Sequence, residues 1–350
     1  MNIKQKEDFY DFVESYWKNQ QQQQPDYWGI AKEYTDSNGN PIAYKVLTLN
    51  SASNYGALAA ILHETNKGKN GEEIVQNYFA WLDDGGFHAN VEAIKQENWV
   101  VFQSNNSELG EAPKDILDAH IRLALLSRRE KQPNSINFNG AFGLLPNLVW
   151  TDEGPFTVED WEEKFVSQEK LPQVIAVDKF PPFFLWNPVP TGVRAANTDM
   201  VRSGAHLAEG TTVMHYGFVN FNAGTLGPSM VEGRISAGTT VDKGTDIGAG
   251  AGFLGTLSGG NDVKMSTGKD CLVGAMAEVG VPLGDNCTVA VGTAFAPGTP
   301  VYDLDNDQTI KAIELAGEGN LLIWRNSQNG RIEVQRKKVE VGLNEELHDN

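Results

Sequence analysis

The stretch Ile235-Ser-Ala-Gly-Thr-Thr-Val241-Asp-Lys-Gly-Thr-Asp-Ile247-Gly-Ala-Gly-Ala-Gly-Phe253 places one large apolar residue at every sixth position. A helix repeats its buried positions about every 3.6 residues and a strand about every two, so neither explains a period of six. A coil with three flat sides of about six residues, each with one inward side chain, does explain it. The stretch therefore predicts a solenoid that winds as a triangular coil.

The sixfold spacing extends beyond this stretch in both directions. The apolar positions are Val201, Leu207, Val213, Val219, Ile235, Val241, Ile247, Phe253, Met265, Cys271, Ala277, Leu283, Val289, Phe295 and Val301. Val219 and Ile235 are sixteen positions apart, which breaks the frame, and a second break covers Leu257–Val263. We expect loops to leave the coil at both breaks, because loops carry chemistry on rigid scaffolds. A glycine-rich sandwich with accidental spacing is the alternative, and the long run of matches in one frame speaks against it.

Composition sets the domain boundaries that we expect. Residues 190–302 hold 21 of the 36 glycines, which fits a coil with many tight corners. We predict a mainly β protein with an α+β N-terminal domain at residues 1–189, a parallel β-helix that carries catalysis at 190–302, and a small β domain at 303–350. The last domain would cap the open end of the coil.

Shorter patterns predict individual elements on either side of the coil. Before it, we expect a hairpin, several helices and a short buried strand: Tyr27–Tyr34 with Ile42–Leu49, helices at Asp8–Trp17, Ser53–His63, Gly71–Leu82, Pro113–Arg129 and after Thr157, and a strand at Val174–Val177. After it, we expect strands at Ile310–Leu315, Leu321–Arg325 and Arg331–Arg336.

Charge and composition exclude several classes of function. The 350 residues carry a formal net charge of −18, which argues against nucleic-acid and anionic-membrane partners. No apolar run is long enough to span a membrane, and the acidic, aromatic start of the chain predicts no export, so we expect a cytoplasmic protein. The only two cysteines, Cys271 and Cys287, predict neither a disulfide scaffold nor a zinc site; we expect two buried thiols.

Two longer strings stand out in the sequence: Val213-Met-His-Tyr-Gly-Phe-Val-Asn-Phe-Asn-Ala-Gly-Thr225 and Met230-Val-Glu-Gly-Arg-Ile-Ser-Ala-Gly238. Three supporting stretches are Phe142-Gly-Leu-Leu-Pro-Asn-Leu-Val-Trp-Thr151, Gly255-Thr-Leu-Ser-Gly-Gly260 and Trp324-Arg-Asn-Ser327. Together they resemble one enzyme family, the tetrahydrodipicolinate N-succinyltransferases in their longer form. The resemblance runs from about residue 115 to the end. It implies a left-handed hexapeptide-repeat coil, a homotrimer with active sites between subunits, and small-molecule substrates. The implied reaction moves the succinyl group of succinyl-CoA to the amine of L-2-amino-6-oxopimelate, on the route to diaminopimelate and lysine.

The reaction needs a base or nucleophile and a cation for carboxylates. Glu232 matches the glutamate to which the family assigns an acyl-anhydride intermediate; a general base in direct transfer is the chemical alternative, and an ion pair with Arg234 the structural one. Arg234 matches a contact to succinyl-CoA, and its guanidinium suits a carboxylate. A salt bridge that stabilises the coil is the alternative role for Arg234.

Three further residues are weaker candidates for binding the acceptor. Arg202 would bind a carboxylate. Asn220 and Asn222 would donate amide hydrogens, or else stack as an asparagine ladder inside the coil. His215 is a possible base by chemistry, but the resemblance favours the glutamate, so we expect His215 to be structural.

The resemblance also implies a coenzyme A groove of small residues and downstream contacts. The matching positions are Ala249, Gly252, Ala275, Gly298, Lys311, Trp324, Arg325, Asn326 and Ser327. Four positions depart from the family pattern: Tyr216, Met276, Ala290 and Pro300. Tyr216 removes a carboxylate that could hold Mg²⁺ together with Asp199, so we predict no metal site. The other departures leave open a related acyltransferase that uses acetyl-CoA or another amine, or a trimeric scaffold without activity.

Overall fold

The structure is a computed structural model that describes residues 26–51, 99–167, 170–182, 186–255 and 264–337. Packing divides the chain into two units: the first takes residues up to Ile121 and Asn137–Lys179, and the second takes Arg122–Ile136 and the chain from Phe180 onward. The helices expected at Asp8–Trp17, Ser53–His63 and Gly71–Leu82, and the break at Leu257–Val263, lie outside the described residues. No described helix is long and apolar enough to cross a membrane.

The first unit contains two small antiparallel sheets. One has the order β2-β1-β3, with β1 at Tyr27–Thr35, β2 at Pro41–Ser51 and β3 at Trp99–Ser104. The other has the order β5-β4-β6, with β4 at Leu148–Thr151, β5 at Gly154–Phe156 and β6 at Val174–Asp178. The expected hairpin of β1 and β2 is confirmed. At its turn, the Asp36 carboxylate accepts the backbone N–H groups of Asn38 and Asn40.

The described residues also form three helices, and one of them continues into the second unit. They are α5 at Ile116–Ser127, α6 at Ala141–Leu144 and α7 at Val158–Val166. The cap predicted for α7 is confirmed, because the Thr157 hydroxyl accepts the backbone N–H of Asp160 at 3.0 Å. Helix α5 is shorter than the expected Pro113–Arg129, and Arg129 lies beyond its end with a left-handed φ of 64°. The burial expected for Val174–Val177 is wrong, since Val174 is 43% and Val177 58% exposed.

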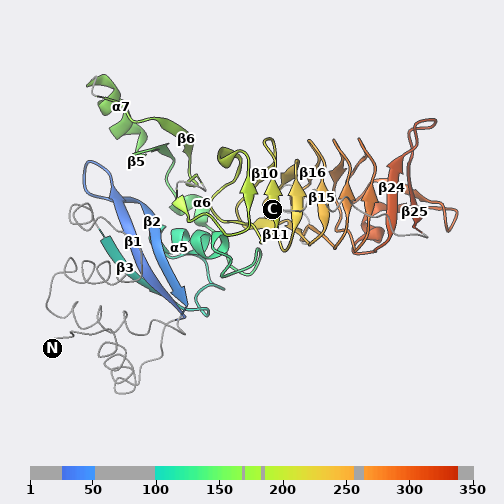
Figure 1. Cartoon of the computed structure of the whole chain (residues 1–350), viewed down its shortest axis with the longest axis horizontal. Coiled ribbons are helices and arrows are strands. Elements are labelled where there is room, and N and C mark those ends of the chain that lie inside the picture. Colours follow the sequence, from blue (N-terminus) through green and yellow to red (C-terminus); the bar gives the residue numbers. More distant parts are fainter. Residues whose placement is uncertain (1–25, 52–98, 168–169, 183–185, 256–263, 338–350) are drawn as a thin grey trace, which may run out of the picture. The chain divides into compact units, whose positions relative to one another are not determined.

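The second unit contains the coil, whose strands stack in parallel on three faces (Figure 1). The first face holds β7 at Arg194–Ala195, β9 at Thr211–Val213, β12 at Ser229–Val231, β15 at Thr245–Ile247, β18 at Leu272–Val273 and β20 at Thr288–Val289. The second face holds β10 at Phe218–Val219, β13 at Arg234–Ile235, β16 at Gly252–Phe253, β19 at Glu278–Val279 and β21 at Ala294–Phe295. The third holds β8 at Ala205–His206, β11 at Ala223–Thr225, β14 at Thr240–Val241 and β17 at Ser266–Thr267. The predicted β-helix is therefore present.

All fifteen residues of the sixfold series are buried in one continuous core cluster. However, the prediction of one inward side chain per side is incomplete. On the first face, Cys271 and Val273 are both fully buried, as are Cys287 and Val289 on the neighbouring strand of the stack. Each side therefore contributes two buried columns that lie two residues apart. Counting every sixth residue can therefore shift from one buried column to the other, and each counted residue is still buried.

The loop predicted between Val219 and Ile235 is wrong. The chain stays in the coil there and forms β11 and β12, and Val219 pairs directly with Ile235 on the neighbouring strand. Two features explain why the spacing of apolar residues did not predict this coil. The inward residue of β11 is Thr225, which is fully buried but polar, and the corner at Glu232-Gly233 brings the next inward residue after four positions instead of six.

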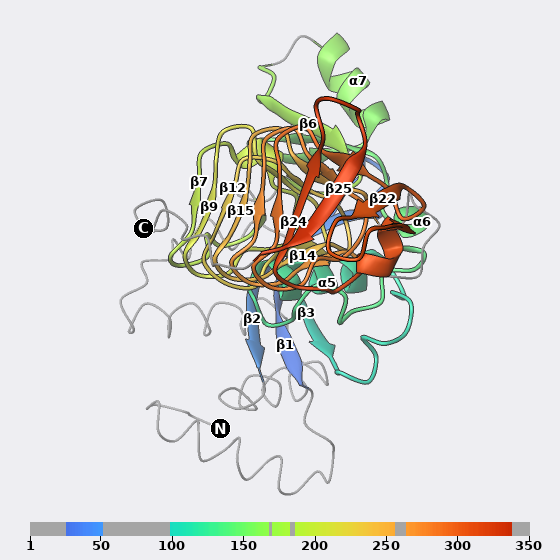
Figure 2. The same cartoon turned by 90° about the vertical axis from the view of Figure 1, so that its right-hand side faces the viewer.

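The end of the coil is covered by strands that turn antiparallel (Figure 2). The cap contains β22 at Pro300–Asp303, β23 at Gln308–Lys311, a 3₁₀ turn at Ala312–Leu315, β24 at Leu321–Arg325 and β25 at Ile332–Arg336. Strand β24 pairs in parallel with β20 and antiparallel with β25, so it ends the stack of the first face. The strand expected over Ile310–Leu315 is largely wrong, because most of that segment is the 3₁₀ turn.

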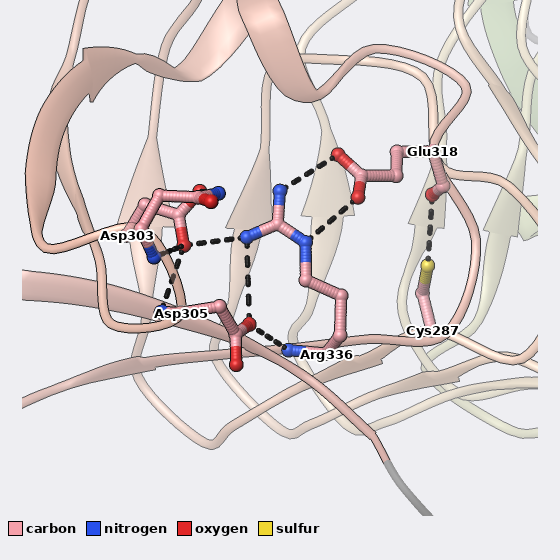
Figure 3. Close-up of polar contacts among 6 residues, drawn as sticks. Cys287, Asp303, Asp305, Glu318 and Arg336 are labelled. Carbon is pink, nitrogen blue, oxygen red and sulfur yellow. Dashed lines mark hydrogen bonds and ion pairs between the residues drawn. The ribbon is translucent and has the colours of Figure 1, made fainter.

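A cluster of charges ties the cap together around Arg336 (Figure 3). Its guanidinium donates from Nε to Glu318 at 2.8 Å and pairs through Nη1 with Asp303 and Asp305. Burial works to raise the pKa of Asp303, but hydrogen bonds from Asn306 and Arg336 outweigh it and hold that pKa below its usual value. The cluster fixes β22, β25 and the loop that carries Glu318.

Candidate active site

The candidate catalytic residue, Glu232, stands at a corner of the coil. The turns that join the first face to the second stack on one another, and we call this stack the first corner. It consists of residues 214–217, 232–233, 248–251, 274–277 and 290–293. The backbone N–H of Glu232 donates to the carbonyl of Ile247 on the next coil at 2.8 Å. Its side chain is half-buried, and no described residue forms a hydrogen bond or ion pair with the carboxylate. The backbone of Glu232 is thus fixed in the coil, and within the described part of the chain its carboxylate is unpaired.

Arg234 follows two residues later, at the start of β13, and its partner is not Glu232. Its Nη2 atom lies 2.7 Å and 3.0 Å from the two carboxylate oxygens of Glu278 on β19. The alternative of a Glu232–Arg234 ion pair is therefore wrong. The corner is only two residues long, so it places the carboxylate of Glu232 and the guanidinium of Arg234 on adjacent parts of one coil.

Several residues matched to coenzyme A contacts stack along the first corner. The carbonyl of Ala249 accepts the backbone N–H of Met276, and the carbonyl of Ala275 accepts that of Gly292, each at 2.9 Å. At the cap, the backbone N–H of Ala290 donates to Ile323, the residue before Trp324. Val231 and Ile323 lie in the same column of paired residues on the first face. Glu232 directly follows Val231, and Trp324 directly follows Ile323. Glu232 and Trp324 therefore lie along the same corner of the coil.

The other matched positions lie elsewhere in the second unit. Gly252 is buried on the second face, while Gly298 lies in the turn before β22, where an added Cβ would meet nothing within 4 Å. Lys311 is exposed and precedes the 3₁₀ turn, where its backbone N–H donates to Glu314. Arg325, Asn326 and Ser327 continue from Trp324 into the β24–β25 turn, and Asn326 donates to Glu333 at 3.0 Å. Of the residues matched to coenzyme A contacts, only some therefore lie along the first corner.

Arg202, Asn220 and Asn222 lie at the opposite end of the second face, where the chain turns toward the third. The Arg202 guanidinium lies over the Phe180 ring, 5.5 Å from its centroid. The side-chain oxygen of Asn220 accepts the backbone N–H of Phe221 at 2.9 Å. The side-chain oxygen of Asn222 accepts the backbone N–H of Asn134, so among the described residues the side-chain hydrogen bonds of the two asparagines are with other residues and not with each other. The structure therefore separates these three residues from the first corner.

Two of the four positions that depart from the family pattern are exposed in the first corner, whereas Ala290 there is half-buried and Pro300 lies in β22. Tyr216 is 81% and Met276 is 68% exposed. His215 is also exposed, and its ring meets that of Tyr216 edge-on at 4.9 Å. Asp199 is exposed, and within the described ranges no three His, Cys, Asp or Glu side chains form a group that could hold a metal ion. The absence of a metal site stays a prediction.

Sequence reasoning missed Glu278, the partner of Arg234. The signal was present, because Arg234, Gly252 and Glu278 all immediately precede an inward residue of the second face. This signal could not be used from the sequence alone, because it requires knowing which residues pair on neighbouring strands. The two-residue corner at Glu232-Gly233 and the longer connection before β17 make the spacing differ from coil to coil. A free carboxylate beside a cation, on an edge lined by alanine and glycine, can accept a proton and bind an anionic thioester.

Comparison with known proteins gives consistent matches. Residues 265–294 match the family model described as the hexapeptide repeat of succinyl-transferase. The chain is 48% identical over 244 residues to the 2,3,4,5-tetrahydropyridine-2,6-dicarboxylate N-succinyltransferase of Pseudomonas paraeruginosa, covering 68% of this chain and 71% of that protein. It is 48% identical over 245 residues to the enzyme of the same name from Vibrio cholerae, with the same coverage.

A solved structure extends the similarity over nearly the whole chain. This crystal structure from Campylobacter jejuni, named as a 2,3,4,5-tetrahydropyridine-2-carboxylate N-succinyltransferase, superimposes with a TM-score of 0.80 at 31% identity. The match covers 95% of this chain and 97% of the other.

Proposed function

This chain belongs to the family of 2,3,4,5-tetrahydropyridine-2,6-dicarboxylate N-succinyltransferases, and from that premise we propose its reaction. It is an acyl-CoA-dependent transferase that moves the succinyl group of succinyl-CoA to the amine of L-2-amino-6-oxopimelate, in the biosynthesis of diaminopimelate and lysine. The observation that carries this proposal is the 48% identity to enzymes of that name over two thirds of the chain.

We assign the central chemical role to Glu232. In direct transfer, its carboxylate accepts a proton from the acceptor amine while the nitrogen attacks the thioester carbonyl; the C–S bond then breaks and coenzyme A leaves as a thiolate. In the covalent alternative, the carboxylate itself attacks the thioester, expels the thiolate and forms an anhydride that the amine then opens. Both routes need a carboxylate without a competing cation, which the free side chain of Glu232 supplies.

Arg234 is proposed to bind a substrate carboxylate, since a guanidinium fork fits a carboxylate in a planar, charge-assisted pair. The pantetheine arm of coenzyme A is proposed to lie along the first corner, past Ala249 and Ala275 toward Trp324 and Arg325. Small residues there permit close approach to the backbone. Gly252, Gly298, Lys311, Asn326 and Ser327 remain part of the proposed coenzyme A site, and Arg202, Asn220 and Asn222 remain acceptor candidates.

The quaternary arrangement is also a proposal. We propose a left-handed coil, residues 190–302 as its catalytic part, and a homotrimer whose active sites lie between neighbouring subunits. The apolar exposure of Tyr216 and Met276 at the first corner supports burial by another subunit.

The two buried, unpaired thiols support a reducing, cytoplasmic location. Light scattering would give the mass, and a crystal structure with coenzyme A would give the handedness and the groove.

The function is tested by following thiol release with each donor and the open-chain acceptor. Succinyl-CoA should be turned over faster than acetyl-CoA, and Glu232→Ala should lose at least about a hundredfold in rate. Glu209→Ala is the matched control, because Glu209 is an exposed carboxylate on another corner of the coil. Faster turnover of acetyl-CoA would overturn the donor assignment, and unchanged activity of Glu232→Ala would overturn the catalytic one.

A further inference from the structure

The outward side chains of the second face form one column that includes the proposed carboxylate-binding arginine. Parallel pairing places Phe218 beside Arg234, Arg234 beside Gly252, Gly252 beside Glu278, and Glu278 beside Ala294. Neighbouring strands lie about 4.8 Å apart, so Arg234 and Glu278 are separated by about twice that distance. Only a long side chain can bridge this gap, and it must pass over the strand between them.

Gly252 is the residue over which Arg234 passes. A Cβ atom at this position would lie 2.5 Å from Arg234 Nη2 and 2.8 Å from its Cζ, and 3.0 Å from Glu278 Oε1. Any side chain at 252 would therefore displace the guanidinium. The backbone of Gly252 has no left-handed φ, so a conformational requirement does not account for glycine here.

The ion pair is poorly suited to stabilising the fold. The side chains of Arg234 and Glu278 are 46% and 32% exposed. Pairs at such exposure contribute little to stability, because solvent screens the charges and two flexible side chains must be ordered. The ion pair has a clearer effect on geometry, because it holds a long, flexible side chain in one position over Gly252, next to the corner that carries Glu232.

The pairing also leaves donors free. Both oxygens of Glu278 contact Nη2. Neither Nε nor Nη1 of Arg234 has a hydrogen-bond partner within the described part of the chain. Arginine offers five N–H donors in a planar fork, so the remaining edge can still receive a ligand carboxylate.

We propose that Glu278 is a positioning residue that holds the guanidinium of Arg234 over Gly252 for the carboxylate of a bound substrate. This inference rests on the proposed succinyl transfer. It gives Gly252 a role distinct from backbone contact with coenzyme A, namely to leave space for the guanidinium. The carboxylate belongs either to the succinyl group or to the acceptor, and kinetics with each substrate distinguishes the two.

The test measures KM and kcat for each substrate in Glu278→Ala, Glu278→Gln and Gly252→Ala. Glu278→Ala should raise one KM about tenfold and change kcat less than about threefold, as expected for loss of ground-state binding. Glu278→Gln keeps an oxygen acceptor for Nη2 and should restore most of that affinity. If the succinyl carboxylate is the ligand, KM for succinyl-CoA rises and KM for acetyl-CoA does not; if the acceptor is the ligand, only its KM rises.

The Arg234→Ala background separates positioning from direct contact. Glu278→Ala and Gly252→Ala should have no further effect there, because both act through the missing guanidinium. A Gly252→Ala effect that persists in this background would place Gly252 in the coenzyme A groove instead. Gly143→Ala is the matched glycine control, since a Cβ there meets nothing within 4 Å.

Unchanged KM values for both substrates in Glu278→Ala would overturn the inference. Circular dichroism and the melting temperature would confirm that each variant is folded, and the two Glu278 variants decide the matter even if Gly252→Ala does not fold. Failure of the underlying function has a different outcome: the unmodified protein would not transfer a succinyl group at all.

Discussion

The side-chain oxygen of Asn222 accepts the backbone N–H of Asn134 at 2.7 Å, which ties the segment after α5 to a corner of the coil. Asn134 in turn donates from its side-chain nitrogen to the carbonyl of Gly238 at 2.9 Å. Asn222 also has a left-handed φ of 51°, a conformation that asparagine tolerates better than most residues. These contacts favour a structural role for a residue that the sequence placed among the acceptor-binding candidates.

Asn222→Ala should therefore lower the free energy of unfolding by about 2 kcal/mol, from the lost hydrogen bond and the strained backbone. Asn222→Gly should lose only the hydrogen bond, about 1 kcal/mol. Denaturant unfolding measures both, alongside KM for the acceptor. If Asn222→Ala kept its stability but had a raised KM for the acceptor, Asn222 would be a substrate-binding residue instead.

Two threonines inside the third face should respond in opposite ways to the same substitution. Thr225 Oγ1 accepts the backbone N–H of Ala208 at 3.0 Å and bonds Thr211 Oγ1 at 2.6 Å. Thr267 Oγ1 is buried without a partner among the described residues. Thr225→Val should cost about 2–3 kcal/mol, because it leaves buried polar groups unsatisfied, whereas Thr267→Val should be neutral or stabilise by about 1 kcal/mol. Each variant is the control for the other in denaturant unfolding, and equal effects would contradict the hydrogen-bond assignment.

Removing the cation at the centre of the cap should destabilise it. Arg336→Met leaves the carboxylate of Asp303, whose side chain is 1% exposed, without its ion pair. We expect the free energy of unfolding to fall by about 3 kcal/mol. Lys114→Met removes an exposed pair with Glu108 and is the matched control, with a change below about 0.5 kcal/mol. A similar small change in Arg336→Met would show that the cluster contributes nothing.

The same cluster predicts a dependence on pH. The pKa of Asp303 lies below its usual value, so its contribution to stability is complete above pH about 4 and is lost as pH falls through the lowered pKa. Arg336 is one cause of that lowering. The difference in stability between Arg336→Met and the unmodified protein should therefore narrow below pH about 4. A difference that stays constant down to pH 2 would contradict this coupling.

His120 predicts a second titration in a different range. Burial lowers its pKa to about 4 although its Nδ1 donates to the carbonyl of Ile116 at 2.8 Å. The unfolded chain binds a proton near pH 6.5, so between about 6.5 and 4 the free energy of unfolding should fall as pH falls. NMR of the His120 ring should show no titration above pH 5, and His120→Leu should make the acid decline less steep. A ring midpoint near 6.5 would contradict a buried neutral histidine.

The corner at Glu232-Gly233 shows where sequence prediction succeeded and failed. The sixfold period predicted the coil, and every residue of the series is buried in its core. The same period was misread between Val219 and Ile235, because Thr225 is polar and apolar patterning does not count a hydroxyl that is satisfied inside the protein. The candidate site was affected in the same way: Glu232 and Arg234 were found from sequence, but Glu278 was not.

The amino-acid sequence by itself determined the repeat, the buried residues and the family, because these depend on which residue types occur at which spacing. Only the tertiary structure decided that Arg234 bonds Glu278 across Gly252, that Asn222 holds Asn134, and that Arg336 gathers three carboxylates. Those contacts join residues from different coils or segments. Their partners depend on the length of every corner and insertion between them, so a shift of two residues at one corner changes which side chains meet.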